Sequence, residues 1–153
     1  MKYVKQVHYI ISSAETSSNL ARYDGIKYGY RTETANTWKE VYTKTRQEGF
    51  GYEAKKKMIA GTFFLDIDNM EDYYKRAQKI RTLIKQELKS IFESVDAMAI
   101  PADSDYTCLA NLTGRPAITV NGVTFIGNFF EEDRLIDLVK RMGDKTWQEK
   151  ITK

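Results

Sequence analysis

Histidine and cysteine, two of the residue types that carry out covalent or metal chemistry, each occur once in this sequence. They are His8 and Cys108, which lie far apart along the chain. A cysteine nucleophile needs a base beside it, and a structural zinc ion needs about four protein ligands. The two residues therefore predict neither a cysteine–histidine dyad nor a metal site. We expect His8 on a helix face and Cys108 as a small packed side chain.

Two serine pairs and a run of lysines are the other candidates. Ser12-Ser13 and Ser17-Ser18 have no Ser-x-x-Lys spacing and no glycine-rich loop beside them, so we interpret them as small residues that let a helix pack closely. Lys55-Lys56-Lys57, together with Arg46 and Arg76, has the charge to contact RNA phosphates. No RNA-binding motif accompanies these residues, and we interpret them as a solvated charged face.

The composition is that of an ordinary globular protein. Of 153 residues, 42% are hydrophobic, and 24 basic residues nearly balance 21 acidic ones, so the net charge of +3 is weak evidence for an anionic partner. A single cysteine excludes an internal disulfide and is typical of a reducing compartment. No apolar run reaches the ~20 residues of a membrane span, and the N-terminus lacks a signal-peptide pattern. We expect a cytoplasmic protein with one domain over residues 1–153 and no cofactor.

Helical spacing of apolar residues recurs through much of the chain. Helices are expected over residues 4–25, 35–46, 52–64, 69–95 and 131–142. The first should end near Gly25, and the fourth should begin with a capping box of Asp68 and Glu71. The side chains expected to face inward are Val4, Val7, Ile11, Ala14, Ser18, Trp38, Val41, Tyr42, Thr45, Met58, Ile59, Thr62, Phe63, Tyr74, Ala77, Ile80, Ile84, Leu88, Ile91, Val95, Leu135, Leu138, Val139 and Met142.

After the fourth helix the periodicity changes to that of strands. Residues 96–101 predict a short buried strand. Asn121-Gly122 favours a type I′ turn, because both of its central residues need positive φ, and so predicts a β-hairpin of residues 117–120 and 123–126. Together these elements predict an α/β fold with about five helices packed on a small sheet.

Five segments resemble, in order, the motifs of one enzyme family. They are Ser12–Gly29 (similar to EASSNLARYDGVRYG), Thr45–Gly51 (TRSEGFG), Gly61–Phe63 (LGTF), Tyr73–Ile84 (YYKKAQKVRTLI) and Ala110–Ile118 (ANLAGLPAI). The chain is thereby identified as a member of the amidase-signature family, and it most resembles the A subunits of glutamyl-tRNA(Gln) amidotransferases. The resemblance implies the C-terminal half of an α/β fold with a mixed central sheet.

The catalytic machinery that this resemblance implies is not found in the sequence. It consists of a nucleophilic serine, a second serine in a strained cis peptide, a proton-transferring lysine and a glycine-rich oxyanion loop. The chain has no Gly-Ser-Ser-Gly run. Two family loops are also shorter here, one spanned by residues 102–106 and one closed by Asn121-Gly122. We therefore expect no catalytic residue in a compact, self-standing protein.

The resemblance also implies where a remnant of the family's glutamine site would lie. Its tyrosine corresponds to Tyr9, and a lysine, Lys57, replaces its arginine. Its aspartate aligns nearest to Ser104, with Asp103 and Asp105 beside it, and we take Asp105 as the candidate. Arginine grips a carboxylate with a planar fork that lysine lacks. Residual glutamine binding is one interpretation, and solvated charges on a helix and a loop are the preferred one.

We interpret the chain as a non-catalytic amidase-like remnant that acts as a binding or assembly protein. The alternative is one piece of a split glutamyl-tRNA(Gln) amidotransferase A subunit, which would hydrolyse glutamine and transfer ammonia to Glu-tRNA(Gln) only with a separate N-terminal chain. On either interpretation, tRNA is a partner only within a larger complex. A membrane is not an expected partner.

Self-association is the expected replacement for the missing half. In the family this half packs against the catalytic half, so apolar surface should be uncovered, and a homodimer is the commonest closed arrangement that would cover it. The residues expected to contribute are Val4, Val7 and Ile11, or Ile118 and Phe125 on the sheet. The competing expectation is a monomer whose tail covers the surface through Trp147.

Overall fold

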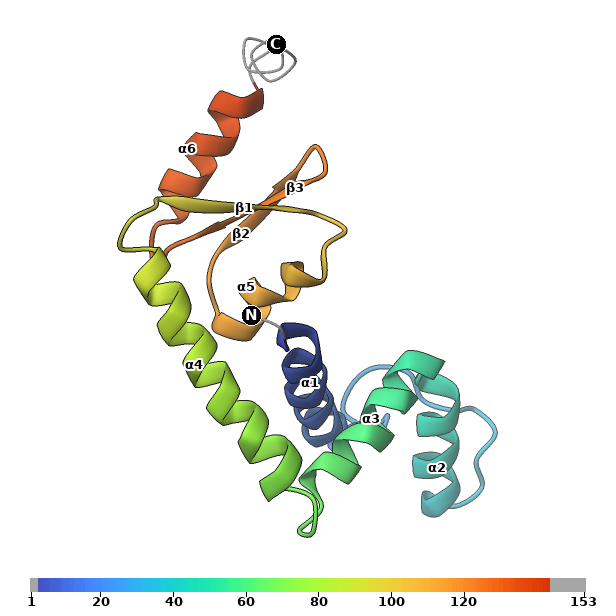
Figure 1. The fold of residues 1–153 in the computed structure, drawn as a ribbon. Helices are drawn as coiled ribbons and strands as arrows, with labels where there is room; N and C mark the ends of the chain where they lie inside the picture. Colours follow the sequence, from blue (N-terminus) through green and yellow to red (C-terminus); the bar gives the residue numbers. More distant parts are fainter. Residues whose placement is uncertain (1–2, 144–153) are drawn as a thin grey trace. The chain divides into compact units, whose positions relative to one another are not determined.

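The computed structural model describes residues 3–143, and it divides the chain into two compact units (Figure 1). Among the described residues, one unit is residues 9–78, and the other combines residues 3–8 with residues 79–143. The described residues form six α-helices, a π-helix, a 3₁₀ helix and a three-stranded sheet, so the expected α/β class is confirmed. None of the helices described has the length and apolarity to cross a membrane. A single domain over residues 1–153 stays a prediction.

Helices alone build the unit of residues 9–78. They are α1 (Val4–Leu20), α2 (Trp38–Gly49), α3 (Tyr52–Leu65), the π-helix η1 (Glu71–Lys75) and the start of α4 (Arg76–Ile91). At the start of α2 the Thr37 hydroxyl accepts a hydrogen bond from the backbone N–H of Glu40 at 3.2 Å. The Glu40 carboxylate accepts from the backbone N–H of Asn36 at 2.9 Å. These bonds satisfy N–H groups at the helix start, which lack partners within the helix.

Helices α1 and α3 cross where small residues meet. Gly61 is buried, and a Cβ atom on it would lie 2.0 Å from the carbonyl oxygen of Ser13 and 2.7 Å from the Cβ of Ser17. Only glycine permits so close an approach. Ser13 is fully buried, and the Ser17 hydroxyl lies 3.0 Å from that of Thr62. The interpretation of the serines as packing residues therefore holds for these two, whereas Ser18, expected inside, is exposed.

The expected inward face of α3 is wrong because of this crossing. Ile59 and Phe63 are 74% and 48% exposed, and Thr62 is exposed as well, while Met58 is half-buried. The face of α3 that meets α1 is the one that carries Gly61, where a large side chain would not fit. Ile59 and Phe63 consequently turn outward, whereas Phe64 packs against Tyr9 of α1.

The expected face of α2 is half right. Val41 and Thr45 are buried, but Trp38 and Tyr42 are 72% and 45% exposed. The loop between α1 and α2 covers the Thr45 side, because the backbone N–H of Thr32 donates a hydrogen bond to the Thr45 hydroxyl at 3.1 Å.

Helix α1 ends at Leu20, earlier than the predicted end near Gly25. The Arg46 guanidinium donates hydrogen bonds to the carbonyl oxygens of Leu20 (2.7 Å), the last residue of α1, and of Tyr23 (2.9 Å), in the turn that follows it. Gly25 lies in the loop that follows α1, at a position where a side chain would not fit. Its φ is +70°, and a Cβ there would lie 2.4 Å from the Thr45 methyl group.

The predicted helix over 69–95 is shorter and begins differently. It starts as η1, and Met70 rather than Asp68 occupies the N-cap position, where no side chain makes a capping hydrogen bond. The expected Asp68–Glu71 capping box is therefore wrong. Glu71 instead forms an ion pair with Lys75 one turn on. The apolar stripe is confirmed in its middle, where Ala77, Ile84 and Leu88 are buried. Val95 lies beyond the end of α4 and is 42% exposed.

The second unit contains the sheet. Its elements from Lys79 onward are most of α4, β1 (Ala97–Pro101), the 3₁₀ helix η2 (Asp105–Thr107), α5 (Cys108–Thr113), β2 (Ala117–Val120), β3 (Val123–Gly127) and α6 (Glu132–Gly143). The strand order is β1-β3-β2, and both pairings are antiparallel, so the expectation of a mixed sheet is corrected. The predicted hairpin is confirmed: Val120 pairs with Val123, and Asn121 and Gly122 have φ values of 51° and 78°.

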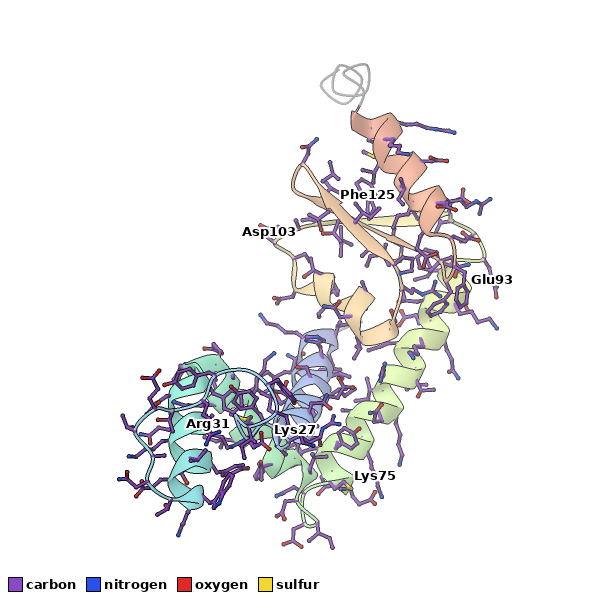
Figure 2. All side chains as sticks on the ribbon, turned by 180° about the vertical axis from the view of Figure 1, so that it is seen from behind. Lys27, Arg31, Lys75, Glu93, Asp103 and Phe125 are labelled. Carbon is purple, nitrogen blue, oxygen red and sulfur yellow. The ribbon has the colours of Figure 1, made fainter. Side chains whose placement is uncertain are left out.

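The central strand contributes to the core of this unit. Phe125 (labelled in Figure 2) and Ile126 of β3 are buried, and Leu135 of α6 packs beside Gly127. Figure 1 shows α6 lying along the sheet. The strand β1 is an edge strand of half-buried and exposed residues rather than the buried strand predicted, because only β3 pairs with it. Leu138 of α6 is also more exposed, at 37%, than expected.

Candidate functional site

Tyr9 lies in α1 and packs against an aromatic residue of α3. Its ring meets that of Phe64 edge to face, with the centroids 6.3 Å apart and the planes at 86°. Lys57 lies seven residues before Phe64 in the same helix, a separation of roughly 10 Å along the axis. The structure therefore places Tyr9 and Lys57 two turns of α3 apart, not side by side.

Asp105 belongs to the other unit and has a different partner. It begins η2 after Ser104, whose hydroxyl accepts from the backbone N–H of Tyr106 at 3.2 Å. The Lys5 amine donates a hydrogen bond to its carboxylate at 2.7 Å, and this bond, with the carboxylate's charge, raises the pKa of Lys5. Both side chains are two-thirds exposed, so the ion pair contributes little to stability. Asp103, labelled in Figure 2, lies in the exposed turn before it.

The remaining candidates take structural positions. The Cys108 thiol donates to the backbone oxygen of Asp105 at 3.0 Å, and partial burial raises its pKa, which makes it a poorer nucleophile. Within residues 3–143 no three His, Cys, Asp or Glu side chains are placed to hold a metal ion. Of the three lysines, Lys55 donates to the backbone oxygen of Gln47, in the last turn of α2, at 2.7 Å. This is a helix-end contact of the kind that complements the helix dipole.

The surfaces expected to form a dimer are mostly inside the chain. Val4, Val7, Ile11 and Phe125 are at most 6% exposed, so they are not available to a second copy. Ile118 is half-buried. The other expected cover, Trp147, lies outside the described residues.

An exposed apolar face was missed by the sequence reasoning. Along α3, Tyr52 and Ile59 are 76% and 74% exposed and Phe63 is 48% exposed. Their spacing of seven and then four residues places them on one side of the helix. Ile67, just past its end, is 86% exposed. We call these four residues the α3 apolar face. The spacing is visible in the sequence, but the tight fit at Gly61, which places the opposite face against α1, appears only in the structure.

A buried arginine was missed too. Arg115 follows Gly114, which has φ +77° and ends α5, and it is 6% exposed. The signal was present, because the corresponding position of the quoted family pattern ANLAGLPAI is leucine. A charged residue at an expected apolar position needs a physical reason.

Comparison with known proteins places these features in one family. The Amidase family model matches residues 1–126, and the chain belongs to the amidase family. Three relatives are glutamyl-tRNA(Gln) amidotransferase A subunits. That of Listeria monocytogenes is 38% identical over 91% of this chain, and that of Clostridium acetobutylicum is 37% identical over 97%. The Fusobacterium nucleatum protein is 36% identical over 94%.

The coverage of the relatives is partial. The matched regions are 35%, 37% and 35% of those three proteins, so the chain spans about a third of their length. The Listeria alignment extends over 168 positions, although this chain has 153 residues, so the relative carries residues within the matched region that this chain lacks.

Proposed function

We propose that this chain is a non-catalytic amidase-family segment that acts by assembly, binding a complementary amidase-like polypeptide to complete an amidase fold. One observation carries the proposal: the α3 apolar face is exposed in a chain that matches A subunits about three times as long. We infer that the complementary polypeptide corresponds to the part of those relatives that lies outside the matched region. The single cysteine favours a cytoplasmic setting for this assembly.

The α3 apolar face has the properties of a contact surface. Monomeric proteins rarely expose contiguous apolar patches of more than a few hundred Å². Here Tyr52, Ile59 and Phe63 follow one another along a single helix. On the neighbouring helix Trp38 and Tyr42, one turn apart, are also exposed. Exposed aromatic residues of this kind are enriched where proteins bind each other.

The proposal assigns no catalytic residue to this chain. Ser13 and Ser17 pack at the α1–α3 crossing, and neither hydroxyl forms a hydrogen bond with a lysine or a histidine. We therefore expect the purified chain to release no ammonia from glutamine or simple amides above the buffer background. Release that is lost when any one serine is replaced would show that a nucleophile had been overlooked.

The test uses the portion of the Listeria relative that lies outside the matched region, produced as a separate chain. We expect it to form a one-to-one complex with this chain, measured by light scattering after size exclusion. Ile59→Asp should abolish the complex, because it puts a charge into an apolar contact. Leu83→Asp, at a 62% exposed site on α4 outside the α3 apolar face, is the matched control and should leave it intact.

Two outcomes would count against the proposal. Absence of any complex at micromolar concentrations would reject the complementary partner. A homodimer that persists in the presence of excess Listeria chain would assign the face to a second copy of this chain. Glutamine hydrolysis that appears only in the mixture would extend the proposal to a split amidotransferase, and Tyr9, Lys57 and Asp105 would then be the first residues to replace.

A further inference from the structure

A pocket of about 430 Å³ lies at the end of α4, in the unit that contains the sheet. Its walls include Lys85, Lys89, Phe92 and Glu93 from the last turns of α4 and the residues that follow it, and Arg115 and Phe129 from the sheet side. Figure 2 labels Glu93 just past the end of this helix. The volume is within the range of small-molecule sites. None of these residues belongs to the α3 apolar face, so the pocket is independent of the proposed assembly surface.

Arg115 occupies this pocket as a stacked cation. Its guanidinium carbon lies 4.2 Å from the ring centroid of Phe92 and 4.4 Å from that of Phe129. One guanidinium nitrogen, Nη1, donates to the side-chain oxygen of Asn128 at 2.7 Å. The Nε–H is buried and has no hydrogen-bond partner.

The charge of Arg115 is incompletely compensated. No carboxylate among residues 3–143 forms an ion pair with it. Two aromatic faces and one neutral amide oxygen stabilise the cation, but a buried charge without a counter-charge remains costly. Burial lowers the pKa of Arg115, as expected for a cation that is costly to bury. A bound anion would reduce this cost by supplying the missing counter-charge.

The other charged groups of the pocket favour the same ligand. Lys85 and Lys89 are one turn apart on α4, and Glu93 is the single acid among the lining residues. The positive charges therefore exceed the negative one by two. The lysine stems and the two phenylalanine rings give apolar walls beside these charges.

We propose that this pocket binds a small organic anion, whose carboxylate or phosphate group contacts Arg115 and the two lysines while its apolar part lies against Phe92 and Phe129. Guanidinium is suited to both groups because its planar donors match two oxygens at once. The backbone supports this position, since Gly114 in the left-handed region and Pro116 flank the arginine. This site would bind and position a ligand; no covalent step is assigned to it.

The experiment titrates the full chain with four probes: benzoate, phenyl phosphate, inorganic phosphate and neutral benzamide. Calorimetry gives the affinities, and the arginine side-chain N–H signals in a nitrogen-15 correlation spectrum give the location. We expect benzoate or phenyl phosphate to bind and to shift the Arg115 Nε–H signal, and benzamide to do neither. The stronger of the two anions identifies the ligand class. Binding of inorganic phosphate as tight as that of phenyl phosphate would contradict the apolar part of the proposal.

Variants make the assignment specific. Arg115→Leu, which introduces the residue of the family pattern, should weaken anion binding by roughly tenfold or more, the effect of losing a charged hydrogen bond. Arg76→Leu, at an exposed arginine on the same helix as the lysines, removes the same charge and should change little. The double variant Lys85→Gln/Lys89→Gln changes two exposed residues and serves as the test if Arg115→Leu does not fold. We expect this double variant to weaken anion binding severalfold.

Three results would overturn the proposal. They are binding of neither organic anion at millimolar concentrations, benzamide binding as tightly as benzoate, and anion binding unchanged in Arg115→Leu or in the double lysine variant.

Discussion

Replacing Gly61 by alanine tests the close approach of α1 and α3 at their crossing. A Cβ at this position would lie 2.0 Å from the Ser13 carbonyl oxygen, whereas an ordinary van der Waals contact begins at 3.4 Å. The helices would have to separate by about 1.4 Å at the crossing, because the obstructing atom is backbone and not the end of a flexible side chain. Overpacking of this kind costs about 1–3 kcal/mol.

Helix propensity acts in the opposite direction, which makes the sign of the result informative. Alanine is about 1 kcal/mol more favourable than glycine inside a helix. If packing takes the upper part of its range, the net loss is about 2 kcal/mol, which lowers a urea midpoint by roughly 1 M at a typical slope. Urea unfolding followed by far-ultraviolet circular dichroism measures this change. The structure thus predicts a lower midpoint where propensity alone predicts a higher one.

Gly49 supplies the matched control. It also lies in a helix of the same unit, and a Cβ there would meet Tyr30 and Tyr23 at 3.4–3.7 Å, an ordinary contact. Gly49→Ala should therefore be neutral or stabilise the protein by up to about 1 kcal/mol. A Gly61→Ala midpoint equal to or above that of the parent protein would refute the close α1–α3 crossing.

The hairpin could be predicted from the sequence because local chemistry determines it. Asn121-Gly122 supplies two positive φ values over a two-residue turn, and no distant contact is needed to select that geometry. The stripe of α4 was predictable for a similar reason, since Ala77, Ile84 and Leu88 repeat at helical spacing over several turns.

The sequence does not show where a capping box forms, because two segments have the residue spacing of one. Asp68 and Glu71 fit the spacing of a capping box, as do Thr37 and Glu40. Only the second pair forms the predicted type of contact, with the Thr37 hydroxyl accepting from Glu40 N–H. The first is overridden by the π-helical turn that begins after Met70. Three-residue spacing does not distinguish these outcomes.

The faces of α2 and α3 could not be predicted from periodicity. An apolar residue on a helix predicts burial only when a neighbour can approach it, and the approach of α1 is decided by Gly61. Ile59 and Phe63 were therefore assigned inward and lie outward. The same limit applies to Arg115, whose burial between Phe92 and Phe129 depends on segments far apart in the sequence.

Three further substitutions test the fold and its uncovered face. Gly122→Val should destabilise the protein by roughly 1 kcal/mol or more, seen as a lower denaturation midpoint; no atom lies within 4 Å of the new Cβ, so the cost is that of positive φ alone. Ser13→Ala should raise stability by about 1 kcal/mol, because the buried Ser13 hydroxyl has no hydrogen-bond partner. Ser18 is exposed, so Ser18→Ala should gain only helix propensity, and equal denaturation midpoints for the two variants would contradict the prediction. Without a complementary chain, the protein should self-associate at micromolar concentrations in light scattering, because 74% of Ile59 is exposed on an apolar face, and Ile59→Asp should return it to the mass of one chain. A single-chain mass for the parent protein, without aggregation, would mean that the α3 apolar face needs no cover in water.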